Sequence, residues 1–267
     1  MSVSIAVITF NEEANIGRML ASVAWADERI VVDSGSTDRT CEIARQHGAT
    51  VFQEPWKGFA AQKNSALEKT SSEWVLSLDA DEEVDPELAR EIQQVASAPD
   101  SAEGYFIARK NYFLGRWIRH GGFYPDRKLR LTRRGGGKFI ELPVHETMRI
   151  EGRTANLQNA LIHHAYPTLA GYVDTMNRYS SLAAEIARSK DEPGSSTLSF
   201  LTHVYLRPAA NFVWNYFARG GFLDGREGLL LHTYHNAYVS WKYAKSWELS
   251  GRTKSDFTTE TRRTRRI

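Results

Sequence analysis

The seven residues Val3–Thr9, VSIAVIT, decide the fold class, and polar residues follow them directly. A short run rich in Val and Ile is typical of a strand that is buried on both faces of a sheet. After this strand we expect a helix that Asn11 caps, because apolar residues recur there at helical spacing. These residues are Ile16, Met19, Leu20 and Val23.

The alternation of strand and helix continues over the first hundred residues. Such alternation implies an α/β fold with a mostly parallel sheet and helices on both faces. Ligands bind outside the carboxyl ends of the strands in sheets of this kind. Strands are expected at Arg29–Val32, Thr50–Phe52 and Trp74–Leu78, and helices at Thr37–Gln46, at Ala60–Lys69 and from Asp85-Pro86, with Asp85 as the cap.

Polar clusters follow three of these strands, at Thr9–Glu13, Asp33–Asp38 and Asp79–Glu83. The carboxyl ends of parallel strands meet at one edge of the sheet, so the three clusters would lie together. Burying carboxylates without a partner is costly, and a cation or a ligand rich in hydroxyl groups would offset that cost. A binding site is therefore expected at this edge.

The motif Asp79-Ala80-Asp81 is the most informative of these clusters. Two Asp residues just past a buried strand can present carboxylates to Mg²⁺ or Mn²⁺, which commonly also binds phosphate oxygens. The competing interpretation is a solvated acidic turn, since such a short motif is frequent by chance. The segment Asp33–Asp38 also has two interpretations: Asp33 at the tip of the strand accepts a hydrogen bond from a base or ribose, or the segment is a Gly/Ser turn in which Asp38 caps a helix.

The composition is that of an ordinary globular protein. The chain has 267 residues, of which 42% are hydrophobic and 25% charged, and its net charge of +2 does not indicate nucleic-acid binding. The single cysteine, Cys41, excludes a disulfide framework. No apolar run is long enough for a membrane-spanning helix, and the first residues lack a secretory signal.

Charge and aromatic residues divide the chain into two parts. The stretch from Leu198 to the end has eleven Lys/Arg against five Asp/Glu, and Phe200–Trp247 holds twelve of the thirty aromatic residues. Aromatic side chains mixed with Lys and Arg suit a membrane interface, although helices packed on the body or on a second subunit would also explain them. With Asp191–Ser196 as linker, we expect a domain at 1–190, a helical extension at 197–250 and a basic, disordered tail at 251–267.

Four segments match one known family in order and spacing: VITFNEE (Val7–Glu13), VVDSGSTDRT (Val31–Thr40), AAQKNSAL (Ala60–Leu67) and SLDADEEVDPEL (Ser77–Leu88). They resemble the inverting glycosyltransferases of family 2. The resemblance implies the GT-A fold, a Rossmann-like and mostly parallel sheet with flanking helices, and a nucleotide-diphosphate sugar as donor. The finer resemblance is to bacterial lipopolysaccharide core β-glucosyltransferases, which add glucose to the first heptose of the inner core.

The resemblance also implies roles for residues at the matching positions. Thr9 and the backbone near Asn11 would border the nucleotide, and Asp33 would face the uracil. Many relatives have two consecutive Asp residues where this chain has Asp33-Ser34, which leaves open which of the two positions contacts the base. Glu12 is a further donor-site candidate, or simply an acidic residue in the first turn of a helix.

The remaining donor-site positions centre on the Asp79-Ala80-Asp81 motif. Lys63 lies where relatives often have a basic residue near the base or the diphosphate. Asp79 would lie near the ribose and be a further metal ligand, with Ala80 between it and Asp81. Asp81 would be the main ligand of Mg²⁺ or Mn²⁺, which offsets charge on the departing diphosphate.

Inverting transfer also needs a base for the acceptor hydroxyl. The resemblance places it at Glu146, with His145 as neighbour, second metal contact or alternative base. The competing interpretation is a His-Glu pair on a surface loop. Asp126 and Glu141 are substitutes for the base.

Two further segments carry charged or titratable side chains. Alternation over Arg127–Leu131 predicts a strand with Arg127, Leu129 and Leu131 on one face and Lys128 and Arg130 on the other. Its basic side chains would bind phosphates or form a solvated face. His163-His164 lacks the spacing of a metal site, so we interpret it as structural.

The resemblance therefore implies a metal-dependent inverting glycosyltransferase that moves glucose from UDP-glucose to a lipopolysaccharide core acceptor. It would be cytoplasmic and peripheral on the inner face of the bacterial inner membrane. One alternative is transfer of another sugar to another bacterial or lipid-linked glycan. The other, from a different class, is a non-catalytic scaffold that binds a sugar nucleotide or a membrane.

Overall fold

The structure is a computed structural model that describes residues 2–141, 146–194 and 196–264, with side chains as far as Gly251. It divides into two compact units. The first holds the chain up to Tyr112 together with Phe123–Ala165, and the second holds Phe113–Gly122 and the chain from Tyr166 onward. The expected boundary lay after residue 190, but the helix Leu169–Ser189 packs along a later helix and so belongs to the second unit.

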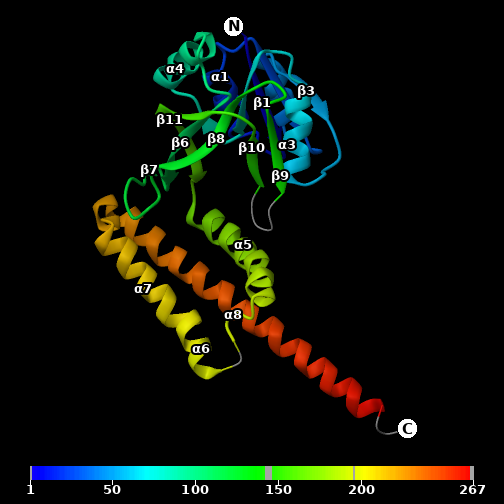
Figure 1. Ribbon diagram of the computed structural model, residues 1–267, viewed down its shortest axis with the longest axis vertical. Coiled ribbons are helices and arrows are strands. Elements are labelled where there is room, and N and C mark those ends of the chain that lie inside the picture. The colour runs from blue at the N-terminus through cyan, green and yellow to red at the C-terminus, as the bar shows by residue number, and fades with distance from the viewer. Residues whose placement is uncertain (1, 142–145, 195, 265–267) are drawn as a thin grey trace. The chain divides into compact units, whose positions relative to one another are not determined.

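The first unit is built on one mixed sheet. Its strands are β1 Val3–Thr9, β2 Glu28–Asp33, β3 Thr50–Gln53, β4 Trp74–Asp79, β5 Glu82–Glu83, β6 Gly104–Phe113, β8 Asp126–Arg133 and β11 Thr154–Tyr166. They lie in the order β3-β2-β1-β4-β8-β6-β11-β5, and the short strand β7 Arg116–Trp117 pairs with β6 (Figure 1). The first four are parallel, as expected, whereas β8 pairs antiparallel with both β4 and β6.

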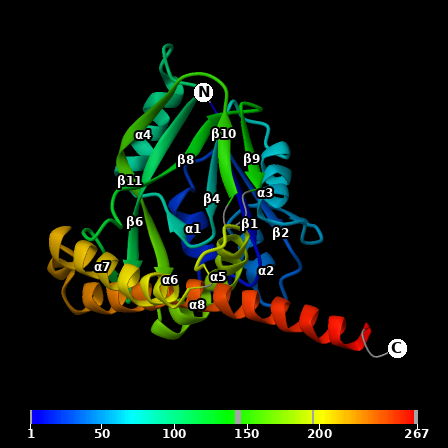
Figure 2. The same ribbon diagram turned by 60° about the horizontal axis from the view of Figure 1, so that its bottom comes forward.

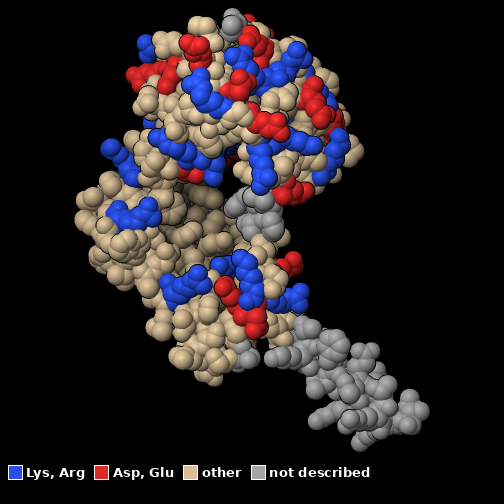
Figure 3. All heavy atoms as spheres, in the orientation of Figure 1, with Lys and Arg blue, Asp and Glu red and all other residues tan. Residues whose placement is uncertain are grey.

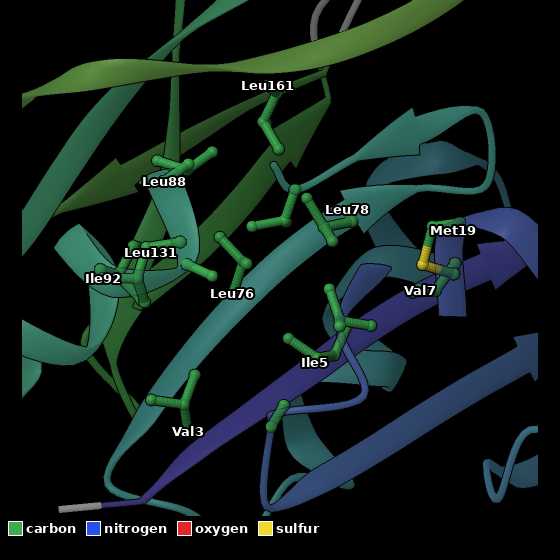
Figure 4. Packing of buried hydrophobic residues seen from close by; sticks show 14 of the residues in the cluster. Val3, Ile5, Val7, Met19, Leu76, Leu78, Leu88, Ile92, Leu131 and Leu161 are labelled. Carbon is green, nitrogen blue, oxygen red and sulfur yellow. The ribbon is translucent and has the colours of Figure 1, made fainter. Parts of the chain in front are cut away.

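Helices cover both faces of this sheet (Figure 2). They are α1 Ile16–Ser22, α2 Thr40–Gln46, α3 Phe59–Glu68 and α4 Pro86–Ser97. Along β1 the side chains alternate as a strand requires: Val3, Ile5 and Val7 join the core with α1, α2 and α4, and Ala6 packs on the α3 side. Figure 4 shows the larger core, where Leu88 and Ile92 of α4 meet the strands. The expected α/β class with flanking helices is confirmed.

A two-stranded hairpin, β9 Gly137–Glu141 and β10 Glu146–Ile150, packs on the same face as α3. The turn before it contains Gly135 and Gly136. Phe139 and Met148 of this hairpin form a small core with Ala60 of α3. The hairpin therefore brings the start of β10 to the first turns of α3.

The start of α4 follows its sequence signals closely. The carboxylate of Asp85 accepts a hydrogen bond from the N–H of Leu88 at 2.8 Å, and Pro86 occupies the first position. The cap expected at Asn11 is wrong, because α1 begins only at Ile16. Asn11 instead has a φ of 54° and lies in the turn after β1.

Strand β8 carries a bulge at Arg130 that local alternation does not reveal. In the pairing with β6, Tyr105 lies opposite Leu131 and Phe106 lies opposite Leu129, which leaves Arg130 as the extra residue. The expectation that Leu129 and Leu131 share a face is therefore wrong. Leu131 packs in the larger core, whereas Leu129 packs with the β9-β10 hairpin, because one inserted residue reverses the alternation.

The second unit is helical. Its helices are α5 Leu169–Ser189, α6 Thr197–Leu201, α7 Arg207–Val213 and α8 Gly225–Thr264, with π-helical turns η1 Thr202–Leu206 and η2 Trp214–Ala218 and a 3-10 turn η3 Gly221–Asp224. The segment Asp191–Ser196, expected to link two domains, connects α5 to α6 within this unit. Helix α8 continues past residue 251, where composition predicted a disordered tail.

From α6 to η2 the chain forms one continuous helical path that packs on α8. Its π-helical turn η1 ends two residues before Pro208, whose ring lacks the N–H that would bond to the carbonyl of Val204. Val204, Ala187 of α5 and Tyr243 of α8 form a small core. None of the helices that the structure describes is both long enough and apolar enough to span a bilayer.

Candidate active site

The polar clusters that follow the first strands meet at one edge of the sheet. In the parallel register Thr9 lies beside Asp33, and Asp79 lies beside Ile8, one residue before Thr9. The three clusters come from β1, β2 and β4, which are neighbours in the sheet. The expected gathering at the carboxyl ends of the strands is therefore what the fold produces.

Asp33 is fully buried and organises the loop that follows β2. Its Oδ2 accepts hydrogen bonds from the N–H groups of Gly35 at 3.0 Å and Ser36 at 2.9 Å, and its Oδ1 accepts one from the Thr9 hydroxyl. Burial raises the pKa of Asp33, but hydrogen bonds from the Ser36 hydroxyl and from the N–H groups of Ser36 and Gly35 outweigh it and leave the pKa below its usual value. The hydroxyl of Ser34 is buried and has no hydrogen-bond partner among the described residues. The base contact expected of Asp33 or Ser34 stays a prediction.

The loop after β1 is tied to the loop after β2. The Oδ1 of Asn11 accepts a hydrogen bond from the N–H of Thr37 at 2.9 Å, and the N–H of Asn11 donates to the Ser36 hydroxyl. Next to it, the pKa of Glu12 is raised by burial and by the negative charges of nearby carboxylates, chiefly that of Asp81. Glu12 thus faces the acidic cluster, and its donor-site role stays a prediction.

Asp79 is held between two cations. Its Oδ1 lies 2.8 Å from the Lys63 Nζ, and its Oδ2 lies 2.5 Å from the Arg130 Nη2. Burial alone would raise the pKa of Asp79, but the two positive charges keep it well below the usual value. Asp79 is therefore an ionised carboxylate with both oxygens already paired.

The bulge at Arg130 directs this side chain into a buried ion network. Besides Asp79, the Arg130 Nη2 contacts the Oε1 of Glu82 at 2.8 Å, and Glu82 is fully buried. Arg109 lies 3.4 Å from the same Glu82 oxygen and 2.5 Å from Asp126. Of the predicted basic patch, Arg130 is therefore an internal residue, whereas Arg127 and Lys128 are exposed. Asp126, an alternative base, is paired with Arg109.

Glu146 is brought to the same place by the β9-β10 hairpin. The side chain of Asn64 in α3 exchanges two hydrogen bonds with the backbone of Phe139, which fixes the hairpin against the helix. Glu146 opens β10, and its Oε1 lies 2.6 Å from the Lys63 Nζ. Burial raises the pKa of Glu146, but the charge of Lys63 outweighs it, so the carboxylate is ionised near neutral pH. His145 lies outside the described residues.

Lys63 therefore links the two parts of the predicted site, Asp79 on the sheet and Glu146 on the hairpin. Only 5% of its side chain is exposed, and it contacts Asp79 and Glu146 at the same time. The resemblance placed Lys63 near the nucleotide, but no local pattern indicated its partners. They lie in a strand and a hairpin that are far from it in sequence.

Sequence reasoning missed one residue of this edge, His163. Its Nε2 lies 3.3 Å from the Oδ2 of Asp81, and its Nδ1 lies 2.7 Å from the Oδ1 of Asn111. The bond to Asn111 places the ring proton on Nδ1, so in the neutral ring the lone pair of Nε2 faces a carboxylate oxygen. The pairing of β11 with β5 creates this contact, and spacing along the chain gave no signal of it.

Asp81 and His163 fit a divalent cation as a pair of ligands. Adjacent ligands of an octahedral ion with bonds of about 2.1 Å lie roughly 3.0 Å apart, close to the separation seen here. Among the residues that the structure describes, no group of three or more acidic, His or Cys side chains could hold a metal. A cation at this pair would therefore need further oxygen ligands, which the phosphates of a nucleotide diphosphate supply.

The arrangement can support a group transfer from a phosphorylated donor. It combines an ionised carboxylate, Glu146, with the cations Lys63 and Arg130 and with Asp81 and His163, which could hold a metal ion. All of these residues belong to the same unit. This set of groups matches displacement at a carbon that carries a diphosphate leaving group.

Residues 4–178 match the sequence profile of the family described as Glycosyl transferase family 2. The chain is 32% identical to the lipopolysaccharide core biosynthesis glycosyltransferase LpsC of Rhizobium meliloti (strain 1021) over 232 residues, 84% of each protein. It is 47% identical over 243 residues to an uncharacterized glycosyltransferase of Rickettsia bellii (strain RML369-C), covering 83% of this chain and 80% of that one.

Solved structures give the same fold at much lower identity. S. aureus TarS 1–349 in complex with UDP-GlcNAc superposes with a TM-score of 0.50 at 19% identity, covering 94% of this chain and 92% of that one. The mannosyltransferase PcManGT from Pyrobaculum calidifontis, in complex with GDP-Man and Mn²⁺, gives 0.52 at 18% identity, covering 92% and 86%. Identities this low carry the fold alone.

Proposed function

The chain belongs to glycosyl transferase family 2, and from this premise we propose that it is an inverting, metal-dependent enzyme that uses a UDP-sugar. The observation that carries the proposal is the double contact of Lys63 with Asp79 and Glu146, because it brings the expected donor edge and the expected base together. The sugar that we propose is glucose. The proposed acceptor is the inner-core heptose of lipopolysaccharide.

Glu146 acts as the base in this proposal. An acceptor hydroxyl gives its proton to the Glu146 carboxylate while its oxygen attacks the anomeric carbon of the donor. The bond from that carbon to the diphosphate oxygen breaks, UDP departs with the electron pair, and the configuration inverts. Lys63 is a positioning residue here, because it orients Glu146 and keeps it ionised.

We assign the metal to Asp81 and His163. Mg²⁺ or Mn²⁺ held there would neutralise charge on the diphosphate. Both oxygens of Asp79 are paired with Lys63 and Arg130, so its contribution as a metal ligand is secondary in this proposal. Asp79 and Ala80 would instead border the ribose, and Thr9, Asn11 and the Asp33-Ser34 pair would border the base.

The similarity to LpsC over most of both chains supports a lipopolysaccharide core acceptor. The reaction would take place on the inner face of the bacterial inner membrane, where a lipid-linked acceptor and a cytoplasmic sugar nucleotide can meet. TarS was solved with UDP-GlcNAc and PcManGT with GDP-Man, so the sugar has to be determined by experiment.

The test combines donor binding with donor turnover. Thermal melting of the purified protein is followed with UDP-glucose, UDP-galactose, UDP-N-acetylglucosamine and GDP-mannose, with and without Mn²⁺, because a ligand of the folded state raises the melting temperature. We expect a metal-dependent rise with UDP-glucose, and release of UDP when acceptor is added. A rise with every UDP-sugar and no transfer to any glycan acceptor would favour the scaffold alternative.

Two variants separate the proposed roles. Glu146→Gln should keep donor binding and lose transfer, whereas Asp81→Ala should lose the metal-dependent rise. Glu151→Gln is the matched control, because Glu151 is an exposed carboxylate that directly follows β10. Normal transfer by Glu146→Gln would move the base to His145 or Asp126.

A further inference from the structure

The helical path Thr197–Ala218 has two apolar faces. One face, with Val204 and Pro208, is buried in the second unit. The other remains exposed among the described residues, although the outer face of a helix in a globular protein is normally polar. It carries Leu198 (73% exposed), Leu201 (45%), Tyr205 (59%), Leu206 (61%), Val213 (55%), Trp214 (62%) and Phe217 (57%).

The turn that follows extends this surface. Phe222 and Leu223 of η3 are 49% and 56% exposed, although η3 is anchored by the buried Asp224. The carboxylate of Asp224 accepts hydrogen bonds from the backbone N–H groups of Arg119 and His120, at 3.1 and 2.8 Å. The exposed apolar side chains therefore stand on a fixed turn. We call the seven residues of the helical path, together with Phe222 and Leu223, the outer apolar face.

The charged residues in the segment that carries the outer apolar face are all positive. The sequence from Pro193 to Leu223 contains no Asp or Glu, and its charged residues are Arg207 and Arg219. Both arginines are exposed. Helix α5 of the same unit, in contrast, carries two acidic and two basic residues. In the space-filling view the surface over α6 and α7 is largely uncharged (Figure 3).

We propose that the outer apolar face binds the surface of an anionic lipid bilayer, with the path Thr197–Ala218 lying in the plane of the membrane. Aromatic side chains at headgroup depth, aliphatic side chains below them and arginines beside anionic headgroups form the pattern of an interfacial helix. Phe222 and Leu223 enter the bilayer at the end of this helix. The lack of acidic residues matches a negatively charged surface.

The use of this surface rests on the proposed lipid-linked acceptor, whereas its binding to lipid does not. Lipid binding is measured without donor or acceptor, and donor binding is measured without vesicles. The two proposals can therefore fail separately. An exposed apolar face can also bind a second copy of the chain, so the experiment also measures dimerisation.

The experiment is co-sedimentation of the full chain with phosphatidylglycerol vesicles and with phosphatidylcholine vesicles. We expect binding to both kinds, tighter to phosphatidylglycerol, with a residual affinity that high salt does not remove. The double variant Trp214→Ser, Phe217→Ser should bind at least about tenfold more weakly, because large apolar side chains leave the bilayer. Arg207→Gln should weaken binding to phosphatidylglycerol about fivefold and leave phosphatidylcholine binding unchanged.

Leu182→Ser is the matched control, because Leu182 is an exposed apolar residue, at 44%, on α5 of the same unit. It should bind vesicles as the parent chain does. Unchanged thermal melting of all variants, measured without lipid, shows that they fold. Full binding by the double variant would overturn the proposal. The proposal would also be overturned if the unsubstituted chain did not bind vesicles and instead formed a dimer that the double substitution dissociates.

Discussion

The two units bury and expose opposite kinds of side chain. In the first unit the charged residues Lys63, Arg130 and Glu82 are buried, and each is paired with an opposite charge. In the second unit the apolar residues are exposed: of the fifteen large apolar side chains that are exposed among the described residues, twelve belong to it. Neither arrangement is the default of a soluble domain, since buried charges and exposed apolar patches both have to be compensated.

The difference shows what each unit is organised to bind. Buried, paired charges at the edge of a sheet fix the positions of carboxylates, as a site for a charged ligand requires. Exposed apolar side chains on a fixed helical scaffold suit a surface that is itself apolar. The match to the family profile ends at residue 178, so it covers the first unit and only the start of the second.

The largest effect that we expect comes from Lys63→Met. This change leaves the carboxylates of Asp79 and Glu146 without their shared cation, and breaking a buried ion pair in this way costs about 3–5 kcal/mol. Urea unfolding gives the loss of stability, and the transfer assay should show no turnover.

The control for this change is Lys69→Met, just past the end of the same helix, which removes a more exposed pair with Glu54. It should cost no more than about 1 kcal/mol and leave transfer intact. Equal losses for the two lysines would remove the distinction between buried and surface ion pairs on which the comparison depends.

Acid should weaken the second unit before the first. Burial lowers the pKa of His235 from 6.5 to about 4, and the hydroxyl of Tyr172 lies 3.5 Å from its Nδ1. The unfolded chain therefore takes up a proton between pH 6.5 and 4 that the folded unit does not. The free energy of unfolding therefore falls by roughly 3 kcal/mol as the pH drops from 6.5 to 4, and it has its full value only above pH 6.5.

Unfolding followed as a function of pH measures this loss, and His235→Gln should flatten the curve between pH 6.5 and 4. The exposed His47→Gln serves as the control and should leave the curve as it is. The lowered pKa values of Asp79, Asp33 and Glu146 act at lower pH, because paired carboxylates lose their stabilising effect only as the pH falls through their folded pKa. A loss that persists in His235→Gln would assign the acid sensitivity to another group.

Gln62 is an exception within the first unit. Its side chain is fully buried, and neither its amide oxygen nor its nitrogen has a hydrogen-bond partner among the described residues. Gln62→Met has a similar shape without the polar groups, so stability should stay the same or rise by about 1 kcal/mol. A clear loss in urea unfolding would mean that the amide is satisfied in solution.

The smallest effect belongs to the outer apolar face. Leu206→Ala removes a side chain that is 61% exposed, so without lipid its cost should stay within about 0.5 kcal/mol. Leu76→Ala, at a fully buried position of β4, should cost about 2–5 kcal/mol in the same urea assay. A large loss of stability for Leu206→Ala would show that other parts of the chain cover this face. That result would contradict the statement that the second unit exposes its apolar side chains.

The sequence predicted the first unit well where short-range signals govern the structure. The run Val3–Thr9 forms β1 over those same residues, and Asp85-Pro86 opens α4 with the expected cap. The family and the fold class followed from segments in the first ninety residues and are confirmed. Asn11 is the exception, because its side chain bonds to the neighbouring loop and α1 starts four residues later than a cap at this position implies.

What the sequence by itself determined is the first four strands, the helices between them, the cap of α4 and the edge of the sheet where the acidic clusters meet. Periodicity and capping depend on residues within a few positions of one another, so a single sequence carries these signals. Only the tertiary structure decided that Lys63 joins Asp79 to Glu146, that a bulge turns Arg130 inward, and that His163 faces Asp81. Arg130 lies 51 positions from Asp79, His163 lies 82 from Asp81 and Glu146 lies 83 from Lys63, whereas Lys63 and Asp79 are 16 apart. All of these contacts depend on strand register, helix packing and hairpin docking, which no local pattern encodes.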